Sequence, residues 1–393
     1  ESEMKDIKKY YLKNIADSPD KFAFENNSPT DDLRDFKRYL KAILDAEKET
    51  ETRSWVKDLI QLVVKYHGKD VIVGGATEAF QMIEIQRMYS RSKQRLHYLH
   101  LPNVFLLGLL IFNKSSVIRK KLYKEIKRTS KKIEDCQENG LTYKYSGGSL
   151  KGEFLFRWRL ASLCHDLGYI ISLDKRMVPT EGFAKLNEIP FFNGANINSI
   201  EDMYMFGNHN LLKILNSTIQ RIDLETYIKI QRKYPFEGNY YDHGMMGALI
   251  FLRFMYGLFE AFPDQGIVTL TNGTRICANK ILLKTSILQV AKAIALHNIE
   301  KHNDAFDIAS GGSFKFYSDR DALSCLLKIS DMLQEWDKPR IGSSGILCKK
   351  TFNIEFRKNH LLLKDFPVGN ICEIQETVSR FSGLKKYVRF KIN

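Results

Sequence analysis

The sequence lacks the features that mark several large classes of protein. Its six cysteines are scattered and form no CxxC pair, which argues against a zinc-ribbon module and fits a reducing compartment. The longest apolar run, residues 104–112 with Gly108 inside it, is far shorter than the about 20 residues that span a bilayer. The first residues show no signal-peptide pattern, and there is no internal repeat or low-complexity tract. We therefore expect a soluble, cytoplasmic protein without a membrane partner.

The composition indicates a globular chain with a large core. Its 393 residues are 44% hydrophobic and 12% aromatic, which is enough for one large core or for two domains. Several cysteines lie in apolar helical runs, where a free thiol packs as a small hydrophobic group. The net charge of +14 suggests an anionic substrate or partner, although charge speaks to steering and solubility more than to mechanism.

Positive charge is concentrated between residues 114 and 132. Nine basic residues in this segment accompany a single acid, Glu125. Ile118, Leu122 and Ile126 recur at helical spacing, so we predict a helix with one packed face and one basic face. Such a face is either a solvated surface or a surface that binds the phosphates of nucleic acid. The sequence leaves both interpretations open.

Helical spacing of apolar residues dominates the chain and predicts a mainly α fold. Thr30 is a suitable N-cap, and Asp31 and Asp32 follow it at the positive end of the predicted helix. We predict further helices over residues 53–66, 77–89, 96–112, 245–259, 280–298 and 321–336. The region 1–94 contains no cluster of ligand-type residues, so we interpret it as an N-terminal helical packing region.

The remaining segments are predicted as additions to this helical core. Residues 135–150 contain three glycines and are predicted to form a loop. The region 170–240 has a mixed pattern with three prolines and short helical pieces near 200–205 and 211–220, so we interpret it as an insertion that could shape a substrate pocket. β-forming residues on both sides of Asn272-Gly273 predict a hairpin arm. Past Pro339, predicted strands (352–356, 360–363, 387–392) and a helix (372–381) form a small basic α+β appendage over 345–393.

Ligand-type side chains recur at the ends of apolar helical segments or inside them. His165 and Asp166 stand side by side at the end of a long apolar run, which we predict to be a helix ending at Gly168. Asp242 is a suitable N-cap for a helix that begins beside it. Each such residue alone has an ordinary structural explanation. Together they are harder to explain, because each unpaired buried charge costs free energy unless a metal or a partner compensates it. The set is His100, His165, Asp166, His243, His297 and Asp331.

The order and the local sequences of these residues resemble the HD-domain superfamily of metal-dependent phosphohydrolases. The resemblance covers about residues 95–340 and is carried by HLPNVFLLG at 100–108, CHDLG at 164–168, DHG at 242–244 and LLKISDML at 326–333. It implies an HD-type helical core in which one metal is held by His100, His165, Asp166 and Asp331. Asp166 would bridge to a second ion held by His243 and His297. These ligands suit Mn, Fe, Ni, Mg or Zn without choosing among them.

The resemblance implies hydrolysis of a phosphate ester of a nucleotide, cyclic or linear. The ions would lower the pKa of a water molecule and stabilise charge on the phosphoryl oxygens, with His165 as a terminal ligand and Asp166 as the bridge. Candidate contacts to the substrate phosphate are Lys328, Lys338 and Arg340. Two alternatives stay open: a nuclease that grips single-stranded nucleic acid through the basic segment 114–132, and a non-catalytic nucleotide-binding sensor or scaffold.

The chain departs from the best-known subclasses at three positions. His97 stands where the dNTP triphosphohydrolases tend to have an arginine, and Tyr169 stands where the cyclic-di-GMP class has a lysine. Asn298 follows His297 where the nucleases often carry a second histidine. His302 is a candidate substitute or additional ligand. The sequence therefore assigns no subclass, and it leaves the substrate, the metal and the oligomeric state open.

Overall fold

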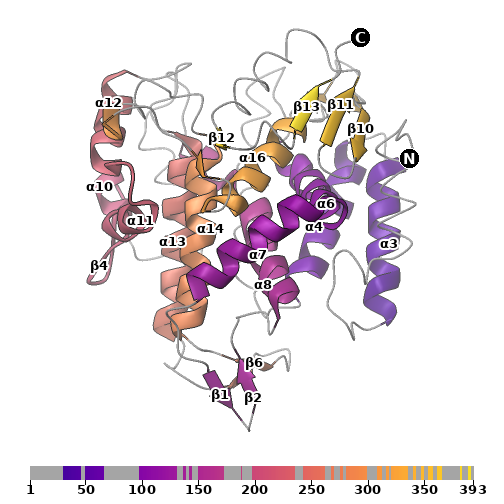
Figure 1. The fold of residues 1–393 in the computed structure, drawn as a ribbon, viewed down its shortest axis with the longest axis horizontal. Coiled ribbons are helices and arrows are strands. Elements are labelled where there is room, and N and C mark those ends of the chain that lie inside the picture. Colours follow the sequence, from indigo (N-terminus) through magenta and orange to yellow (C-terminus); the bar gives the residue numbers. More distant parts are fainter. Residues whose placement is uncertain are drawn as a thin grey trace.

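A computed structural model of the chain gives a mainly α fold, as predicted (Figure 1). The description below is limited to the parts of the chain that this structure defines. These are residues 30–45, 49–65, 97–130, 136–138, 141–143, 149–171, 187, 197–234, 242–261, 267–269, 275–277, 280–298, 308–311, 316–317, 320–334, 340–341, 347–348, 353–356, 361–364, 381–382 and 388–390.

The described helices form a central group with one set of helices on each side of it (Figure 1). The central helices are α6 (His97–Lys114), α7 (Ser116–Ser130), α8 (Leu150–Cys164), the 3-10 helix η3 (Leu167–Ile170), α13 (His243–Ala261), α14 (Lys280–Leu296) and α16 (Ala322–Gln334). The N-terminal pair is α3 (Thr30–Asp45) and α4 (Glu49–Lys65), and the insertion contributes α10 (Ile200–Met203), α11 (Leu211–Ile219) and α12 (Leu224–Lys233).

The N-terminal helices follow the predicted apolar pattern. Helix α3 begins at Thr30 as expected, and its residues Phe36 and Leu40 are fully buried. Helix α4 begins at Glu49, earlier than the predicted residue 53. The predicted helix 77–89 lies outside the described residues. Both described helices bury one apolar face, as the helical spacing predicted.

Helices α6 and α8 pack against each other unusually closely. A Cβ atom added to Gly108 would lie 1.8 Å from Cζ2 of Trp158, so only glycine fits at this crossing. The indole Nε1 of Trp158 donates a hydrogen bond to the carbonyl oxygen of Phe105 at 2.9 Å. The rings of Phe112 and Phe154 stack with centroids 3.7 Å apart. This contact fixes the relative positions of the two helices that lead to His100 and His165.

The strands occur in short pieces outside the helical core. One prediction was wrong: residues 135–150 are not only a loop, because β1 (Cys136–Glu138) and β2 (Leu141–Tyr143) pair as an antiparallel hairpin. Asn139-Gly140, which connects these strands, is a hairpin signal of the kind used at 272–273. The one predicted hairpin, around residues 272–273, is confirmed by the antiparallel pair β5 (Ile267–Thr269) and β6 (Arg275–Cys277). Two further short antiparallel pairs are β3 (Met205–Phe206) with β4 (His209–Asn210) and β8 (Arg340–Ile341) with β9 (Leu347–Cys348).

The C-terminal segment contains the three predicted strands. They form one sheet in the order β10 (Asn353–Phe356), β11 (Leu361–Lys364) and β13 (Val388–Phe390). The predicted helix 372–381 lies outside the described residues except for its last position. That position begins β12 (Phe381–Ser382), which pairs in parallel with β7 (Phe316–Tyr317) ahead of α16. A strand pairing therefore connects the predicted appendage to the segment that leads into the core.

Two expectations from the composition can be compared with the structure. Among the described helices, none is by itself long and apolar enough to cross a membrane; α6 and α7 meet the length only together, across a bend of 100°. Cys164 and Cys325 are buried free thiols. Burial raises the pKa of Cys164 to about 12 and the pKa of Cys325 well above its usual value, so both pack as protonated hydrophobic groups.

Candidate metal centre

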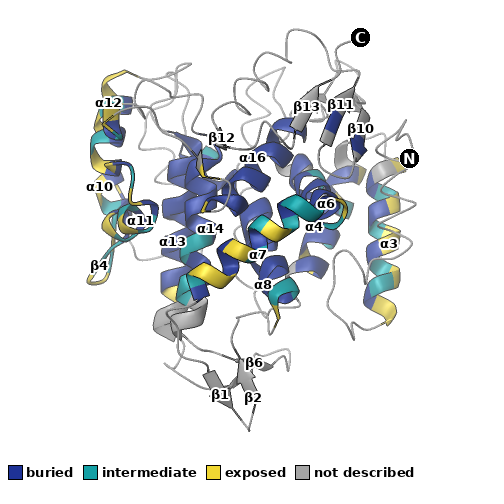
Figure 2. Cartoon of the chain, in the orientation of Figure 1, coloured by how far each residue is buried: buried dark blue, intermediate teal, exposed yellow. Residues whose placement is uncertain are grey.

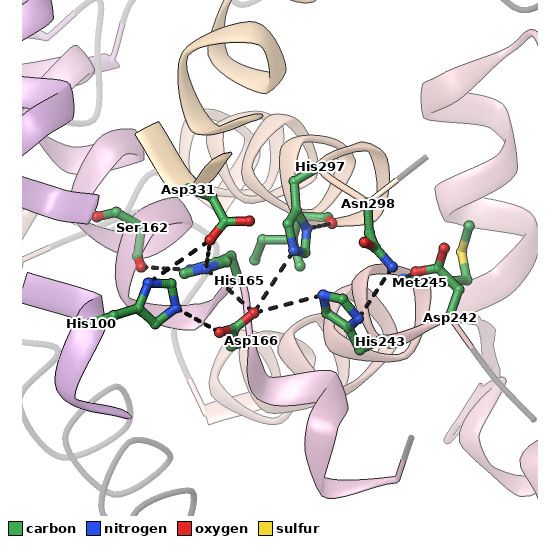
Figure 3. Close-up of polar contacts among 11 residues, drawn as sticks. His100, Ser162, His165, Asp166, Asp242, His243, Met245, His297, Asn298 and Asp331 are labelled. Carbon is green, nitrogen blue, oxygen red and sulfur yellow. Dashed lines mark hydrogen bonds and ion pairs between the residues drawn. The ribbon is translucent and has the colours of Figure 1, made fainter. Parts of the chain in front are cut away.

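His165 and Asp166 lie in a turn, not inside a helix as the sequence suggested. Helix α8 begins at its N-cap Ser149, whose side chain accepts a hydrogen bond from the Gly152 N–H at 2.9 Å, and it ends at Cys164. The 3-10 helix η3 starts at Leu167. The change from an α-helix to a 3-10 helix leaves both side chains at the junction. From there they point toward the other candidate ligands (Figure 3).

Two glycines bring this turn against helix α13. A Cβ atom added to Gly168 would lie 1.7 Å from the carbonyl oxygen of His243. One added to Gly247 would lie 3.1 Å from the His165 carbonyl oxygen and equally far from the Gly168 nitrogen. The backbones therefore touch where side chains would separate them. This contact places His165 and Asp166 beside the first turn of α13, which carries His243.

The start of α13 also packs against the end of α14. A Cβ atom added to Gly244 would lie 2.9 Å from the Ile294 carbonyl oxygen and 3.1 Å from Nδ1 of His297. Helix α14 ends at Leu296, so His297 lies in the turn that follows it. His297, a predicted ligand, therefore lies at the end of α14, next to the start of α13, where His243 lies.

Asp166 lies at the middle of the group (Figure 3). Its Oδ2 is 2.8 Å from Nε2 of His100. Its Oδ1 is surrounded by three imidazole nitrogens: Nε2 of His165 at 3.3 Å, of His243 at 3.7 Å and of His297 at 3.9 Å. A carboxylate with imidazoles around both oxygens has the arrangement expected of a bridging ligand.

Asp331 approaches from helix α16 on the other side of His165. Its Oδ1 lies 3.4 Å from Nε2 of His165 and 3.9 Å from Nδ1 of His100. All six predicted ligands are thus brought together, from five separate segments of the chain. Their exposed fractions are His100 0%, His165 0%, His297 0%, Asp166 1%, Asp331 6% and His243 8%.

Two of the histidines have a fixed tautomer. Nδ1 of His165 donates to the Ser162 carbonyl oxygen at 2.9 Å, and Nδ1 of His297 donates to the Ile294 carbonyl oxygen at 2.6 Å. A carbonyl oxygen only accepts, so a neutral ring must carry its proton on Nδ1 and present the Nε2 lone pair to the centre. Nε2 of His297 has no hydrogen-bond partner among the described residues. Metal-ligating histidines are typically oriented in this way.

The electrostatics of the centre favour an added positive charge. Burial lowers the pKa of His165, but the carboxylates of Asp166 and Asp331 raise it by more, so the net shift is upward. Burial and the neighbouring His165 lower the pKa of His297 to about 4, which keeps that ring neutral at pH 7. The two carboxylates therefore create a negative potential that favours a cation, and His297 presents a lone pair to the same centre.

These residues fit a metal ion. The group His100, His165 and Asp331 and the group His165, Asp166 and His297 each place their ligand atoms within 4.8 Å of one another, and all of these residues are buried. Buried His/Asp groups of this kind could hold a metal ion. His243 belongs to neither group. Its ring stacks on Tyr169 with centroids 4.0 Å apart, and its Nδ1 lies 3.2 Å from Nδ2 of Asn298.

The remaining predicted residues are only partly described. Lys328 is buried, with 4% of its surface exposed, and it precedes Asp331 by one helical turn on α16. Arg340 begins β8 and His97 begins α6, but the structure describes no more than their backbone. Lys338 and His302 lie outside the described residues.

Comparisons of the chain with protein-family models, with curated proteins and with solved structures find no match. The resemblance to the HD-domain superfamily therefore stays a prediction. It rests on the order of the six residues in the sequence, while their meeting at one buried centre is an observation of the structure.

Proposed function

We propose that this chain is an HD-type, metal-dependent phosphohydrolase that cleaves a phosphate ester of a nucleotide. The observation that carries the proposal is the meeting of four histidines and two aspartates from five segments around Asp166. Two of the histidines turn their Nε2 atoms inward because backbone carbonyls hold their Nδ1 protons. A cluster that served stability alone would gain nothing from directing lone pairs toward one another.

The six residues divide into two sets around the shared Asp166. His100, His165, Asp166 and Asp331 would hold one divalent ion, and Asp166, His243 and His297 would hold a second. When bound, such ions act as Lewis acids and make a water molecule more acidic at neutral pH. The mixture of imidazole and carboxylate suits Mn, Fe, Ni or Zn, and Mg would rely on the carboxylates.

The chain's own residues supply orientation and exclude water. The carbonyls of Ser162 and Ile294 fix two imidazole rings, and the glycine contact at Gly168 holds the turn against α13. Burial of the centre strengthens every charge interaction with a phosphate group. Lys328, close to Asp331 on α16, and the predicted contacts Lys338 and Arg340 would add positive charge for substrate phosphates.

A metal analysis combined with a substrate panel tests this proposal. Purified protein should carry about one to two transition-metal ions per chain, as the two ligand sets require. Nucleotides, cyclic dinucleotides and single-stranded nucleic acids would be assayed with Mn²⁺, Mg²⁺ or Ni²⁺. Hydrolysis of a nucleotide that depends on the metal supports the proposal. Tight nucleotide binding without turnover under all metals would favour a sensor, and absence of both metal and turnover would exclude the phosphohydrolase.

A nuclease is the second candidate, and the exposure of helix α7 favours it. Ile118, Leu122 and Ile126 are buried, which confirms the predicted packed face. The acid of this helix, Glu125, is also buried, and its Oε2 accepts a hydrogen bond from the Leu323 N–H at 2.8 Å. Part of α7 is exposed (Figure 2), and because its single acid is buried, the exposed charges of this helix are all basic. They belong to Lys120, Lys124, Lys127 and Arg128.

Charge reversal separates the two candidates. Replacing Lys120, Lys124 and Lys127 with glutamate should weaken binding of single-stranded nucleic acid and flatten its salt dependence if this face contacts phosphates. The matched control reverses three exposed lysines elsewhere, Lys37, Lys41 and Lys213. A loss confined to polymeric substrates and to the α7 variant supports the nuclease. Equal losses in both variants would show a general effect of net charge.

A further inference from the structure

His243 is held differently from the other candidate ligands. It is the most exposed of the six, it lies in neither tight ligand group, and its Nε2 is 3.7 Å from Asp166. It is also the first residue of helix α13. Its position relative to Asp166 therefore depends on what fixes the start of this helix.

A closed ring of hydrogen bonds fixes that start. Oδ1 of Asp242 accepts from the Met245 N–H at 3.0 Å and so caps the helix. Oδ2 of Asp242 accepts from the Tyr227 hydroxyl at 2.7 Å, and that hydroxyl accepts from Nε2 of Gln231 at 2.7 Å. Oε1 of Gln231 accepts in turn from the Asp242 N–H at 3.0 Å. The ring thus joins helix α12 of the insertion to the residue beside His243.

This ring is buried and fully connected. Tyr227 is 0% exposed, Asp242 1% and Gln231 3%. Each carboxylate oxygen of Asp242, the tyrosine hydroxyl and both ends of the glutamine amide take part in it. Buried networks in which every member is satisfied are rigid, because breaking one bond leaves a desolvated polar group. Such a network holds backbone position more tightly than apolar contact alone.

The insertion is itself fastened along α13. Nη1 of Arg253 donates to the carbonyl oxygens of Asp202 at 3.0 Å and of Met205 at 2.5 Å. Helices α10, α11 and α12 lie together beside α13 (Figure 1). Helix α12 has its own N-cap, because Asp223 accepts from the N–H groups of Glu225 and Thr226. The ring at Asp242 is therefore anchored on a supported helix.

We propose that Tyr227 and Gln231 are positioning residues for His243. By holding Asp242 and the first turn of α13, they keep the His243 imidazole directed at Asp166. The insertion then decides whether the second ion binds, and the first ion depends on the core helices alone. This inference rests on the proposed function, because it assigns a role within the same metal centre.

The hydroxyl of Tyr227 can be removed with little change in volume. Tyr227 bonds the neighbour of His243 and not the ligand itself, so in Tyr227→Phe the second ion should bind about 10-fold more weakly, at the lower end of the range for lost outer-sphere partners of ligands, and the first ion should bind as in the wild type. Co²⁺ titration followed by visible absorption reports both events without an assay of turnover. The matched control is Tyr256→Phe. It removes a buried tyrosine hydroxyl from α13 itself, about 20 Å along the helix from His243.

The outcomes separate this inference from the function beneath it. A folded Tyr227→Phe protein that binds both ions with wild-type affinity overturns the positioning role. A wild-type protein that binds a single ion also overturns it and leaves the first ligand set standing. A wild-type protein that binds no ion overturns the proposed function as well. If Tyr227→Phe does not fold, the same titration is done with Gln231→Met, which removes both hydrogen bonds of the Gln231 side-chain amide at nearly constant volume.

Discussion

The core of this protein contains two clusters of buried polar side chains that differ in their balance of positive and negative charge. One is the candidate metal centre around Asp166. The other, which we call the charge-paired network, combines three acids with three bases from helices α7, α8, α14 and the segments beside them. Its members are the buried Glu125, Glu153, Arg157, Lys292 and Asp321 and the partly buried Arg221.

The charge-paired network matches two of its acids with cations, and the third, Glu125, accepts a hydrogen bond from the Leu323 N–H. Asp321 lies 2.7 Å from both Nη2 of Arg221 and Nζ of Lys292. Nε of Arg157 donates to Oε1 of Glu153 at 2.6 Å, and the Ser286 hydroxyl donates to the same oxygen. Such a network needs no added ion, because its own side chains carry charges of both signs.

The metal centre gathers acceptors instead. Two carboxylates and the inward Nε2 atoms of His165 and His297 face one another within a few ångströms. Burial alone therefore does not identify a functional site in this chain, because both groups are buried. The difference lies in charge balance: one group contains side-chain charges of both signs, and the other would be completed by a cation.

The largest expected effect tests this difference at Asp166. Asp166→Ala removes the shared ligand, so hydrolysis should fall by about a thousandfold or more, since ions supply several kcal/mol of transition-state stabilisation. Binding of the second ion should be lost. The metal-free variant loses the contact between Asp166 and His100 but also the cost of burying a carboxylate, so its free energy of unfolding should fall by less than in Asp321→Ala. Turnover assays, metal analysis and urea unfolding give the three values.

Unchanged turnover in Asp166→Ala would remove this residue from the chemistry and with it the phosphohydrolase proposal. A large loss of stability with metal still bound would instead place Asp166 among the structural charges. The comparison of the two buried groups would then fail.

The next effect is the reverse pattern at Asp321. Asp321→Ala leaves Lys292 and Arg221 without their carboxylate, and breaking a buried ion pair typically costs about 3–5 kcal/mol. Urea unfolding should show this loss, and the folded fraction should bind as many metal ions as the wild type. A loss below about 1 kcal/mol would show that the network contributes little net stability.

The sequence pointed to the residues that meet around Asp166 better than to those of the network. The candidate ligands are residue types in short motifs that can be recognised from the sequence alone, such as His165 beside Asp166 and Asp242 before His243. The network's acids and bases resemble ordinary surface charges. Glu125, in particular, was predicted as the one acid of a basic segment, and the structure shows it buried against α16. Only the packing of the helices reveals such pairings.

Positions that depend on backbone contact were also missed. The sequence placed His165 and Asp166 on a helix, and the structure places them in the turn between α8 and η3. Gly168 was interpreted as a helix end, but its lack of a side chain serves the contact with α13. The hydrogen-bond ring through Tyr227 and Gln231 joins an insertion with a mixed pattern to the core, so no local periodicity pointed to it.

A third prediction concerns that glycine contact. In Gly168→Ala, the added methyl group would overlap the His243 carbonyl oxygen, so the turn and α13 must move apart. Overpacking of this kind typically costs about 1–3 kcal/mol of stability. The affinity for the second ion should fall more than that for the first, because the movement separates Asp166 from His243. Co²⁺ titration and urea unfolding measure both effects.

Gly257→Ala is the control for this substitution. Gly257 lies on α13, the helix that Gly168 contacts, and an added Cβ would come no closer than 3.7 Å to its nearest neighbour, Phe206. Alanine should be tolerated there or should stabilise the helix by up to about 1 kcal/mol. If both alanine variants behaved alike, close backbone approach at Gly168 would not be what positions the two sets of ligands.

The smallest expected effect is a pH dependence within the charge-paired network. Burial raises the pKa of Asp321, but Lys292 and Arg221 lower it by more, so its pKa in the folded protein is below its ordinary value. The ionised carboxylate therefore adds stability that is fully present above the unfolded pKa of about 3.9 and is lost as the pH falls through the folded pKa. Asp321→Asn lacks this contribution. Its deficit in unfolding free energy should be largest near pH 6 and should shrink below about pH 4.

Glu125 provides the opposite sign within the same network. Burial raises its pKa, and Lys292 and the Leu323 N–H offset this only in part, so its folded pKa is above the ordinary value. Its ionisation therefore costs stability as the pH rises, and Glu125→Gln should gain stability relative to the wild type between about pH 4 and pH 7. Urea unfolding of both variants across this range measures the two slopes. If the difference in unfolding free energy from the wild type changed with pH in the same direction in both variants, the two acids would not have separate environments. The network would then not differ from the metal centre in the way described above.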